Sequence, residues 1–131
     1  HGHTAWLQRR VSKMLLIFGG TTEGRRLCEA LSAAGRKAEA FIATEYGANL
    51  LRDLPGITLR TGRLNVAAMI AAIQAAEGTV VIDATHPYAR DVTRNLVQAC
   101  AETGTEYIRV LRDERSLRGG AQRGAGGGRL P

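Results

Sequence analysis

Two short loops in this 131-residue sequence combine residue types that hold anions and move protons. In the first, glycines let the backbone pass close to a phosphate, and a helix that follows offers free amide groups and the positive end of its dipole. Its GGxxxG spacing differs from the GxGxxG fingerprint, and it lacks the Gly-Lys-Ser/Thr ending of a Walker-type ATPase. We favour dinucleotide phosphate binding over a tight turn that needs glycine for geometry alone. The loop comprises Gly19, Gly20, Thr21, Thr22, Glu23 and Gly24.

The second loop is more polar than a simple connection between two elements needs to be. His86 can protonate a substrate near neutral pH, and Tyr88 can donate a hydrogen bond or stack on a planar ring. Each side chain also has a structural alternative, since a histidine before a proline can cap a helix and Asp83 can bind neighbouring amides. Ligand contact and loop architecture are therefore equally supported. The loop comprises Asp83, Ala84, Thr85, His86, Pro87 and Tyr88.

Hydrophobic periodicity indicates the elements that position these loops. The apolar run 14–18 stops at two glycines, which is typical of a strand buried on both faces of a parallel sheet. Helical spacing follows through Leu27, Leu31 and Ala34, with Gly35 at its end. Further strands are predicted at 38–44, 57–60, 79–84 and 106–111, and a short helix at 46–54. A third helix has Val66, Met69, Ile70 and Ile73 on its apolar face. The last helix starts at Pro87, ends at Gly104 and has Val92, Leu96, Val97 and Cys100 on its apolar face.

Strands that alternate with helices predict an α/β fold, a Rossmann-like doubly wound parallel sheet of about five strands in the order 3-2-1-4-5 with three α/β/α layers. Ligands of such sheets bind beyond the carboxyl ends of the strands, where strands 1 and 4 separate. Both polar loops follow those two strands. After strand 2, Glu45 by itself favours NAD, whereas Arg25, Arg26 and Arg63 can supply countercharge for the phosphate of NADP, so these residues leave the cofactor open.

The net charge of +6 belongs to the ends of the chain. Residues 1–13 contribute +3 and residues 112–131 another +3, while 14–111 hold ten basic and ten acidic residues. Because the basic residues of the middle are scattered among acids, we expect no nucleic-acid partner. The sequence has no apolar run of about 20 residues and no signal-peptide core, so we expect no membrane association and a cytoplasmic protein. Cys28 and Cys100 lack metal-ligand spacing, and we expect buried, reduced thiols and no metal.

Composition divides the chain into three parts. We predict a disordered upstream extension at 1–13, a cofactor-binding domain at 14–113 and a disordered Gly/Arg-rich tail at 114–131.

Four segments carry a family resemblance. They are MLLIFGGTTEGRRL (14–27), TEYG (44–47), GRLN (62–65) and, most specific of all, VIDATHPYA (81–89). In this order and separation they resemble the precorrin-6A reductase family of cobalamin biosynthesis. The resemblance covers about residues 14–113, and TEYG and GRL look more like the members that act on the cobalt complex.

The resemblance implies an NADPH-dependent reductase with two Rossmann-like domains that reduces one double bond of a corrinoid, precorrin-6A or cobalt-precorrin-6A. The second domain would be missing here. By the same resemblance, the cofactor would contact Gly19, Gly20, Thr21, Thr22, Glu23, Thr44, Tyr46, Arg63, Thr85 and Pro87, with Thr44, Tyr46 and Arg63 near its adenosine end. His86 and Tyr88 would border the nicotinamide and the substrate, as candidate catalytic proton donors.

Two other functions fit parts of the pattern. A non-catalytic NAD(P)-sensing module could use the same glycine loop. A corrinoid reductase, unlike a sensor, should have a cleft with positive potential near His86 and Tyr88, because its substrate bears many carboxylates. A sugar-nucleotide or short-chain oxidoreductase would usually carry a YxxxK pair, but Tyr46, Tyr88 and Tyr107 have no lysine four residues later, so we rank this function low. The oligomeric state is left open.

Overall fold

The strand order places both polar loops at one edge of a single sheet. The computed structural model describes residues 13–76 and 78–111, and the strand pairings within them are all parallel. The order across the sheet is β3-β2-β1-β4-β5, which confirms the predicted doubly wound α/β fold. The strands are β1 (Met14–Phe18), β2 (Ala38–Ile42), β3 (Ile57–Thr61), β4 (Thr79–Asp83) and β5 (Glu106–Arg109). The extension and the tail predicted at the ends lie outside the described residues, apart from Lys13.

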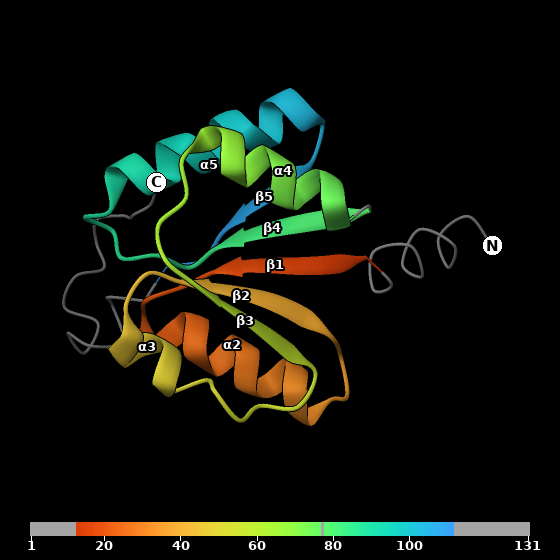
Figure 1. Ribbon diagram of the computed structural model, residues 1–131, viewed down its shortest axis with the longest axis vertical. Helices are drawn as coiled ribbons and strands as arrows, with labels where there is room; N and C mark the ends of the chain where they lie inside the picture. The colour runs from red at the N-terminus through yellow and green to blue at the C-terminus, as the bar shows by residue number, and fades with distance from the viewer. Residues whose placement is uncertain (1–12, 77, 112–131) are drawn as a thin grey trace, which may run out of the picture.

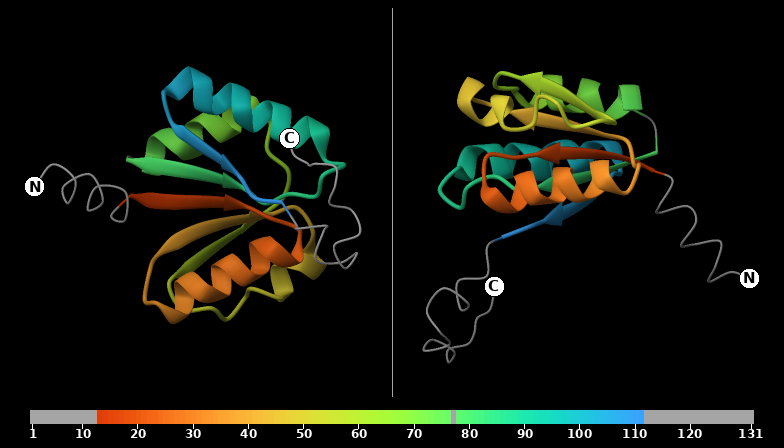
Figure 2. Two further views of the ribbon diagram at one scale, coloured as in Figure 1. Left: turned by 180° about the vertical axis from the view of Figure 1, so that it is seen from behind. Right: turned by 90° about the horizontal axis from the view of Figure 1, so that it is seen from below.

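The helices form the two outer layers of the fold. One pair covers one face of the sheet and the other pair covers the opposite face, as Figure 1 shows with the sheet almost edge-on. Figure 2 turns the same arrangement so that the strands lie side by side behind α2. The helices are α2 (Thr22–Ala33) and α3 (Glu45–Asn49) on one face, and α4 (Val66–Ala76) and α5 (Arg90–Thr103) on the other.

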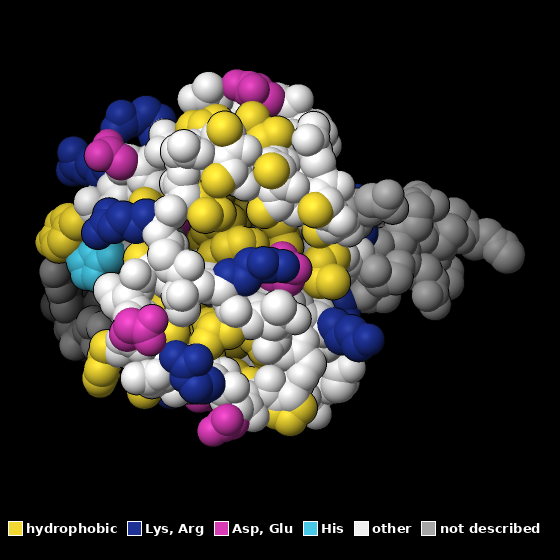
Figure 3. Space-filling view, viewed as in Figure 1, with side chains coloured by type: hydrophobic (Ala, Val, Ile, Leu, Met, Phe, Trp, Pro, Cys, Tyr) yellow, Lys and Arg dark blue, Asp and Glu magenta, His cyan; other side chains and the backbone are white. Residues whose placement is uncertain are grey.

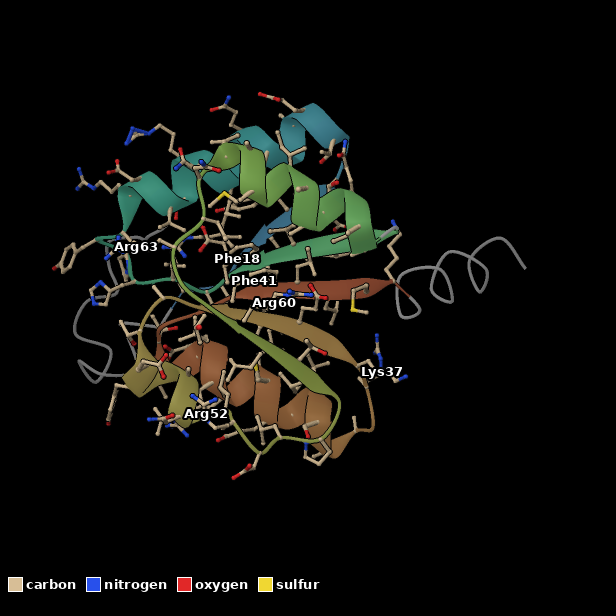
Figure 4. All side chains as sticks on the ribbon, viewed as in Figure 1. Phe18, Lys37, Phe41, Arg52, Arg60 and Arg63 are labelled. Carbon is tan, nitrogen blue, oxygen red and sulfur yellow. The ribbon has the colours of Figure 1, made fainter. Side chains whose placement is uncertain are left out.

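Each face of the sheet has its own hydrophobic core, because successive side chains of a strand point to opposite faces. In β1, Leu16 and Phe18 pack toward α4 and α5, whereas Ile17 packs toward α2 and α3. Hydrophobic side chains also gather between α4 and β3 (Figure 3), where Arg60 pairs with Glu39 at 3.4 Å (Figure 4). The burial of both faces explains why the central strands are read as continuous apolar runs.

Several predicted boundaries differ from the structure. The strands predicted to reach residues 44, 84 and 111 end at Ile42, Asp83 and Arg109. The helix predicted at 46–54 is only Glu45–Asn49, continued by turns, because Gly47 and Asn49 are poor helix formers and Leu51 instead packs into the core.

The buried stripe of α5 is rotated from the predicted one. Val97 is 46% exposed, and the buried positions are Leu96, Ala99 and Cys100. This rotation follows from the helix packing against both β4 and α4, which local periodicity does not specify.

The two cysteines are free and buried, in agreement with the predicted reduced thiols. Burial raises the pKa of Cys28 to about 11. No helix within 13–76 and 78–111 is long and apolar enough to span a membrane. Within the same residues, no group of three or more His, Cys, Asp or Glu side chains could hold a metal ion.

Candidate functional site

The register of the sheet brings the two polar loops to the same level. Phe18, the last residue of β1, pairs with Asp83, the last residue of β4. The amide of Ala84 then donates a 2.7 Å hydrogen bond to the carbonyl of Phe18. The chain therefore enters both loops side by side, at the point where strands 1 and 4 separate.

Thr21 joins the two loops through its side chain. Its hydroxyl donates a 2.7 Å hydrogen bond to the carbonyl of Ala84 and accepts one of 3.2 Å from the amide of Gly24. The second bond makes Thr21 the N-cap of α2. Because the hydroxyl proton is already donated to Ala84, this side chain contributes loop architecture, and its backbone remains as the part that can meet a ligand.

The glycines of the first loop have different roles. Gly24 packs against the second loop, since a β-carbon there would lie 3.1 Å from the β-carbon of Ala84. Gly19 is similarly tight, 3.1 Å from Cδ1 of Ile42. Gly20 has a φ of +146°, and a β-carbon there would meet no atom within 4 Å. Gly20 thus combines a backbone that only glycine adopts readily with open space in front of it.

Three cavities meet at Gly20. The β4 pocket, about 570 Å³, is lined by Gly20, Thr21, Thr22, Glu23, Thr85, His86, Pro87, Tyr88, Val110 and Leu111. The α5 pocket, about 430 Å³, includes Gly19, Gly20, Thr44, Arg63, Thr85, His86 and Asn95 among its lining residues. The α3 pocket, about 300 Å³, includes Gly20, Thr21, Thr22, Thr44 and Tyr46. A ligand seated at Gly20 can therefore extend in three directions along the carboxyl edge of the sheet.

The structure separates two residues that were predicted together. Tyr46 lines the α3 pocket and Arg63 the α5 pocket, and only Thr44 of the predicted adenosine contacts borders both. Thr44 is also the N-cap of α3, since its hydroxyl accepts a hydrogen bond from the amide of Gly47 at 3.1 Å. Arg63 lies at the carboxyl edge of the sheet, opposite to Lys37 (Figure 4), and makes no hydrogen bond or ion pair with the other described residues.

His86 and Tyr88 both line the β4 pocket, but neither lies deep within it. Tyr88 is 83% exposed, and the two rings are 4.9 Å apart at a tilt of 36°. The amide of Tyr88 donates a 3.2 Å hydrogen bond to Nδ1 of His86. A backbone amide can only donate, so Nδ1 is unprotonated and the neutral ring carries its proton on Nε2.

Pro87 does not start α5, contrary to the prediction. The amide of Ala89 donates to the carbonyl of His86 at 2.9 Å, and the helix begins only at Arg90. Pro87 occupies the second position of this turn, which suits its fixed φ as well as the first turn of a helix does. His86 consequently supports the turn and does not cap the helix.

Asp83 is the centre of a buried polar network. It is fully buried, and its carboxylate accepts hydrogen bonds from the hydroxyls of Thr85 and Thr93 at 2.7 Å each and of Tyr107 at 2.8 Å. Nη1 of Arg109 lies 3.1 Å from Oδ1 of Asp83 and also donates to the carbonyl of Thr85 at 3.0 Å. The network ties the second loop to α5 and β5.

The network determines the ionisation of Asp83. Burial alone would raise the pKa of this carboxyl, but the hydrogen bonds from Thr85, Thr93 and Tyr107 outweigh it and hold the pKa below its ordinary value. Burial raises the pKa of Tyr107, and its hydrogen bond to Asp83 acts in the same direction. Asp83 is therefore a charged structural group, in line with the interpretation that it binds its neighbours.

Comparison with known proteins gives a family match that includes both loops. A family model for precorrin-6x reductase CbiJ/CobK matches residues 14–124. The chain belongs to this family. Its resemblance to the family, first seen in the glycine loop and in VIDATHPYA, is thereby confirmed.

Individual relatives of this CbiJ/CobK chain agree. It is 39% identical over 100 residues to the cobalt-precorrin-6A reductase of Salmonella typhimurium, a match that covers 76% of this chain and 38% of that protein. It is 40% identical over 90 residues to the precorrin-6A reductase of Rhodobacter capsulatus, with 69% and 35% covered. A solved structure of CobK precorrin-6A reductase matches with a TM-score of 0.63 and 33% identity, over 77% of this chain and 38% of that one. The chain thus spans less than two fifths of the length of these relatives.

Sequence reasoning missed two residues of the candidate site. Arg109 supports the second loop from the end of β5, and Asn95 of α5 lines the α5 pocket. Arg109 could have been found, because it lies in the strand predicted beside β4, where it pairs with Asp83. Asn95 had no such signal, since its inward orientation depends on how α5 is rotated against the sheet.

Proposed function

We propose that this chain is the cofactor-binding part of an NADPH-dependent reductase that acts on precorrin-6A or cobalt-precorrin-6A in cobalamin biosynthesis. The observation that carries the proposal is the meeting of three cavities at Gly20, between the N-terminus of α2 and the loop after β4. A dinucleotide has a central pyrophosphate with a nucleoside on each side, which is the shape that this arrangement accommodates. The names of the relatives supply the substrate class.

The residues present fit such a cofactor. The pyrophosphate would lie at Gly20, where nothing occupies the space that a side chain would fill, and would face the first amides of α2. Gly19, Thr21, Thr22 and Glu23 would surround it. NADPH, when bound, supplies a hydride. The residues of this chain would bind the two halves of the cofactor in separate pockets and so fix their positions.

We place the adenosine half in the α5 pocket and the nicotinamide half in the β4 pocket. Arg63 supports the first assignment, because it is a cation with no described partner beside Thr44 at the mouth of the α5 pocket. A guanidinium in this position suits the 2′-phosphate that distinguishes NADPH from NADH. Glu45 by itself would favour NAD, but its Oε1 forms an ion pair with Nη2 of Arg52 at 3.4 Å. Tyr46 would then border the outer side of the ribose or phosphate from the α3 pocket.

Thr85, His86, Pro87 and Tyr88 would border the nicotinamide and the substrate. His86 presents an N–H at Nε2 when its ring is neutral, so it would then donate a hydrogen bond to the bound ligands. Only the imidazolium form of the ring would deliver a proton from this nitrogen. Tyr88 is exposed and has a ring suited to stacking on a planar macrocycle. The Asp83 network would hold this loop in place without contacting the ligands.

One observation favours the second candidate, a non-catalytic NAD(P)-sensing module. The lining of the β4 pocket within the described residues contains Glu23 and no lysine or arginine, whereas a polycarboxylate substrate calls for positive charge. Under our proposal, that charge comes from the larger part of the relatives' length, which this chain does not span. The two candidates share the cofactor and differ in whether a corrinoid binds beside it.

The proposal is tested by titrating the purified chain with NADPH and, separately, NADH, followed by nicotinamide fluorescence or calorimetry. We expect tighter binding of NADPH, and loss of binding in Gly20→Asp, which places a charged side chain where the pyrophosphate would lie. The matched control is Gly35→Asp, since Gly35 also has a positive φ, +75°, and open space, but lies at the far end of α2. Absence of NADPH binding by the folded wild-type chain would contradict the proposal.

The reductase and the sensor are separated by adding a polycarboxylate tetrapyrrole, uroporphyrin, to the NADPH-saturated chain. A reductase fragment should shift the Soret band of the porphyrin, and the shift should diminish in Tyr88→Ala. A Soret shift that is unchanged in Tyr88→Ala would contradict the placement of the substrate beside this ring.

A further inference from the structure

The α5 pocket has an apolar floor of the kind that receives a flat ring. Phe18 and Phe41 form this floor, with their rings stacked 4.4 Å apart at an angle of 6°, and Met69 and Val92 line the pocket beside them. Figure 4 shows Phe18 and Phe41 together at the centre of the sheet. Ligand pockets typically combine such apolar walls with a few polar groups that determine specificity.

Asn95 is the side chain amide in this lining, and it is only partly buried. Within the described residues it makes no hydrogen bond, whereas the other asparagines are engaged. Asn49 accepts a hydrogen bond from Arg52 at 3.0 Å, and Asn65 accepts one of 2.8 Å from the amide of Ala68 at the start of α4. Asn95 therefore has its full hydrogen-bonding capacity available inside a pocket.

The charged neighbour of Asn95 on the same helix is already paired. Asp91 also lines the α5 pocket, and its carboxylate accepts a 2.6 Å hydrogen bond from Arg94. The other polar side chains that line the α5 pocket are Thr44, Arg63, Thr85 and His86. Thr85 already donates its hydroxyl proton to Asp83, and Nδ1 of His86 already accepts from the amide of Tyr88. Only the amide of Asn95 offers a free donor and a free acceptor on one planar group.

We infer that Asn95 recognises the base edge of adenine in the adenosine half of the cofactor. The inference rests on the proposed function and adds the residue that determines the base. An asparagine amide pairs with adenine in two places at once, because its oxygen accepts from the 6-amino group and its nitrogen donates to a ring nitrogen. A base without a free 6-amino group leaves the oxygen of Asn95 unpaired.

The α3 pocket is a poorer match for the base. Its polar groups include Thr44, whose hydroxyl already caps α3, and Tyr46, which is 77% exposed. It is also the smaller of the two cavities, about 300 Å³ against about 430 Å³. The stacked floor and the unpaired amide occur together in the α5 pocket.

The test compares two cofactors in two proteins. NADP and its etheno analogue, in which a bridge blocks the 6-amino group and N1 of the adenine, are titrated against the wild-type chain and Asn95→Leu, which keeps the volume of the side chain. We expect the wild type to bind NADP about tenfold more tightly than the etheno analogue, because one good contact to a base edge contributes about that much discrimination. In Asn95→Leu, the preference should shrink to less than about twofold, because the cycle isolates the contact between amide and base.

Gln98→Ala is the matched control. Gln98 lies on the same helix but is exposed and bonded to Glu102 at 2.9 Å, so its replacement should leave both affinities unchanged. Circular dichroism shows whether each variant is folded. If the wild type binds NADP and Asn95→Leu keeps the wild-type preference, the role of Asn95 is overturned while the proposed function stands. If the folded wild type binds neither cofactor, the proposed function fails and the inference fails with it.

Discussion

The hydroxyl of Thr21 donates a 2.7 Å hydrogen bond to the carbonyl of Ala84, across 63 residues of sequence. The same oxygen caps α2 by accepting from the amide of Gly24, and Gly24 in turn packs against Ala84. The two loops of the candidate site are therefore one interlocked unit, in which the cap of a helix also positions the loop after β4.

Replacement of Thr21 by valine should lower the free energy of unfolding by about 1–3 kcal/mol, because it removes a helix cap and leaves the carbonyl of Ala84 without a partner. Thr21→Ser should restore most of this stability, since serine keeps the hydroxyl. Urea denaturation followed by circular dichroism measures both. Thr22→Val, one residue along the same helix, serves as the control, and an equal loss there would refute the explanation.

Arg63→Gln should weaken NADPH binding by roughly 10- to 100-fold and leave NADH binding unchanged, because it removes the cation that we assign to the 2′-phosphate. Fluorescence titration with each cofactor gives the two affinities. Arg60→Gln is the control, since Arg60 lies on β3 and pairs with Glu39 outside the α5 pocket. Equal losses for both cofactors in Arg63→Gln would show that this side chain does not select the phosphate.

Asp83→Asn should destabilise the fold by roughly 2–4 kcal/mol, since it removes the buried charged partner of Arg109, whose own side chain is partly exposed. Thermal and urea denaturation at neutral pH measure this loss. Asp53→Asn, at an exposed carboxylate in the turns after α3, should cost far less. A small effect at Asp83 would mean that the neighbouring hydroxyls, and not the charge, hold the loop.

The pH dependence of stability follows from the lowered pKa of Asp83. Because this carboxyl binds its proton less readily in the folded state than in the unfolded state, its contribution is present above the unfolded pKa of about 4 and is lost as the pH falls through the folded value. The unfolding free energy of the wild type should therefore decline below about pH 4. The difference between wild type and Asp83→Asn should narrow over the same range, and a constant difference down to pH 2 would contradict this account.

The neutral ring of His86 should carry its proton on Nε2, because the amide of Tyr88 donates to Nδ1 at 3.2 Å. Long-range ¹H–¹⁵N spectra of the folded chain distinguish the two tautomers directly. His86→Asn should preserve the turn, since its side chain oxygen can accept the same hydrogen bond, and should remove the donor at Nε2. A spectrum with the proton on Nδ1 would overturn the assignment.

The layout of this fold follows from local patterns along the chain. Apolar runs identified the strands, and their alternation with helices predicted the strand order and hence the two loops that meet at the carboxyl edge of the sheet. These features are local or follow from general rules of chain connection, so a single sequence contains them. The family resemblance had the same source, because two of its four motifs, including the most specific one, contain those loops.

The distribution of the side chains among the cavities at that edge depends on tertiary packing. Tyr46 and Arg63 line different cavities, and Asn95 lines the α5 pocket. The hydroxyl of Thr21 donates its hydrogen bond to the carbonyl of Ala84. Each outcome depends on the rotation of a helix or the direction of a loop. Those are determined by packing between residues far apart in the sequence, which periodicity along the chain does not encode.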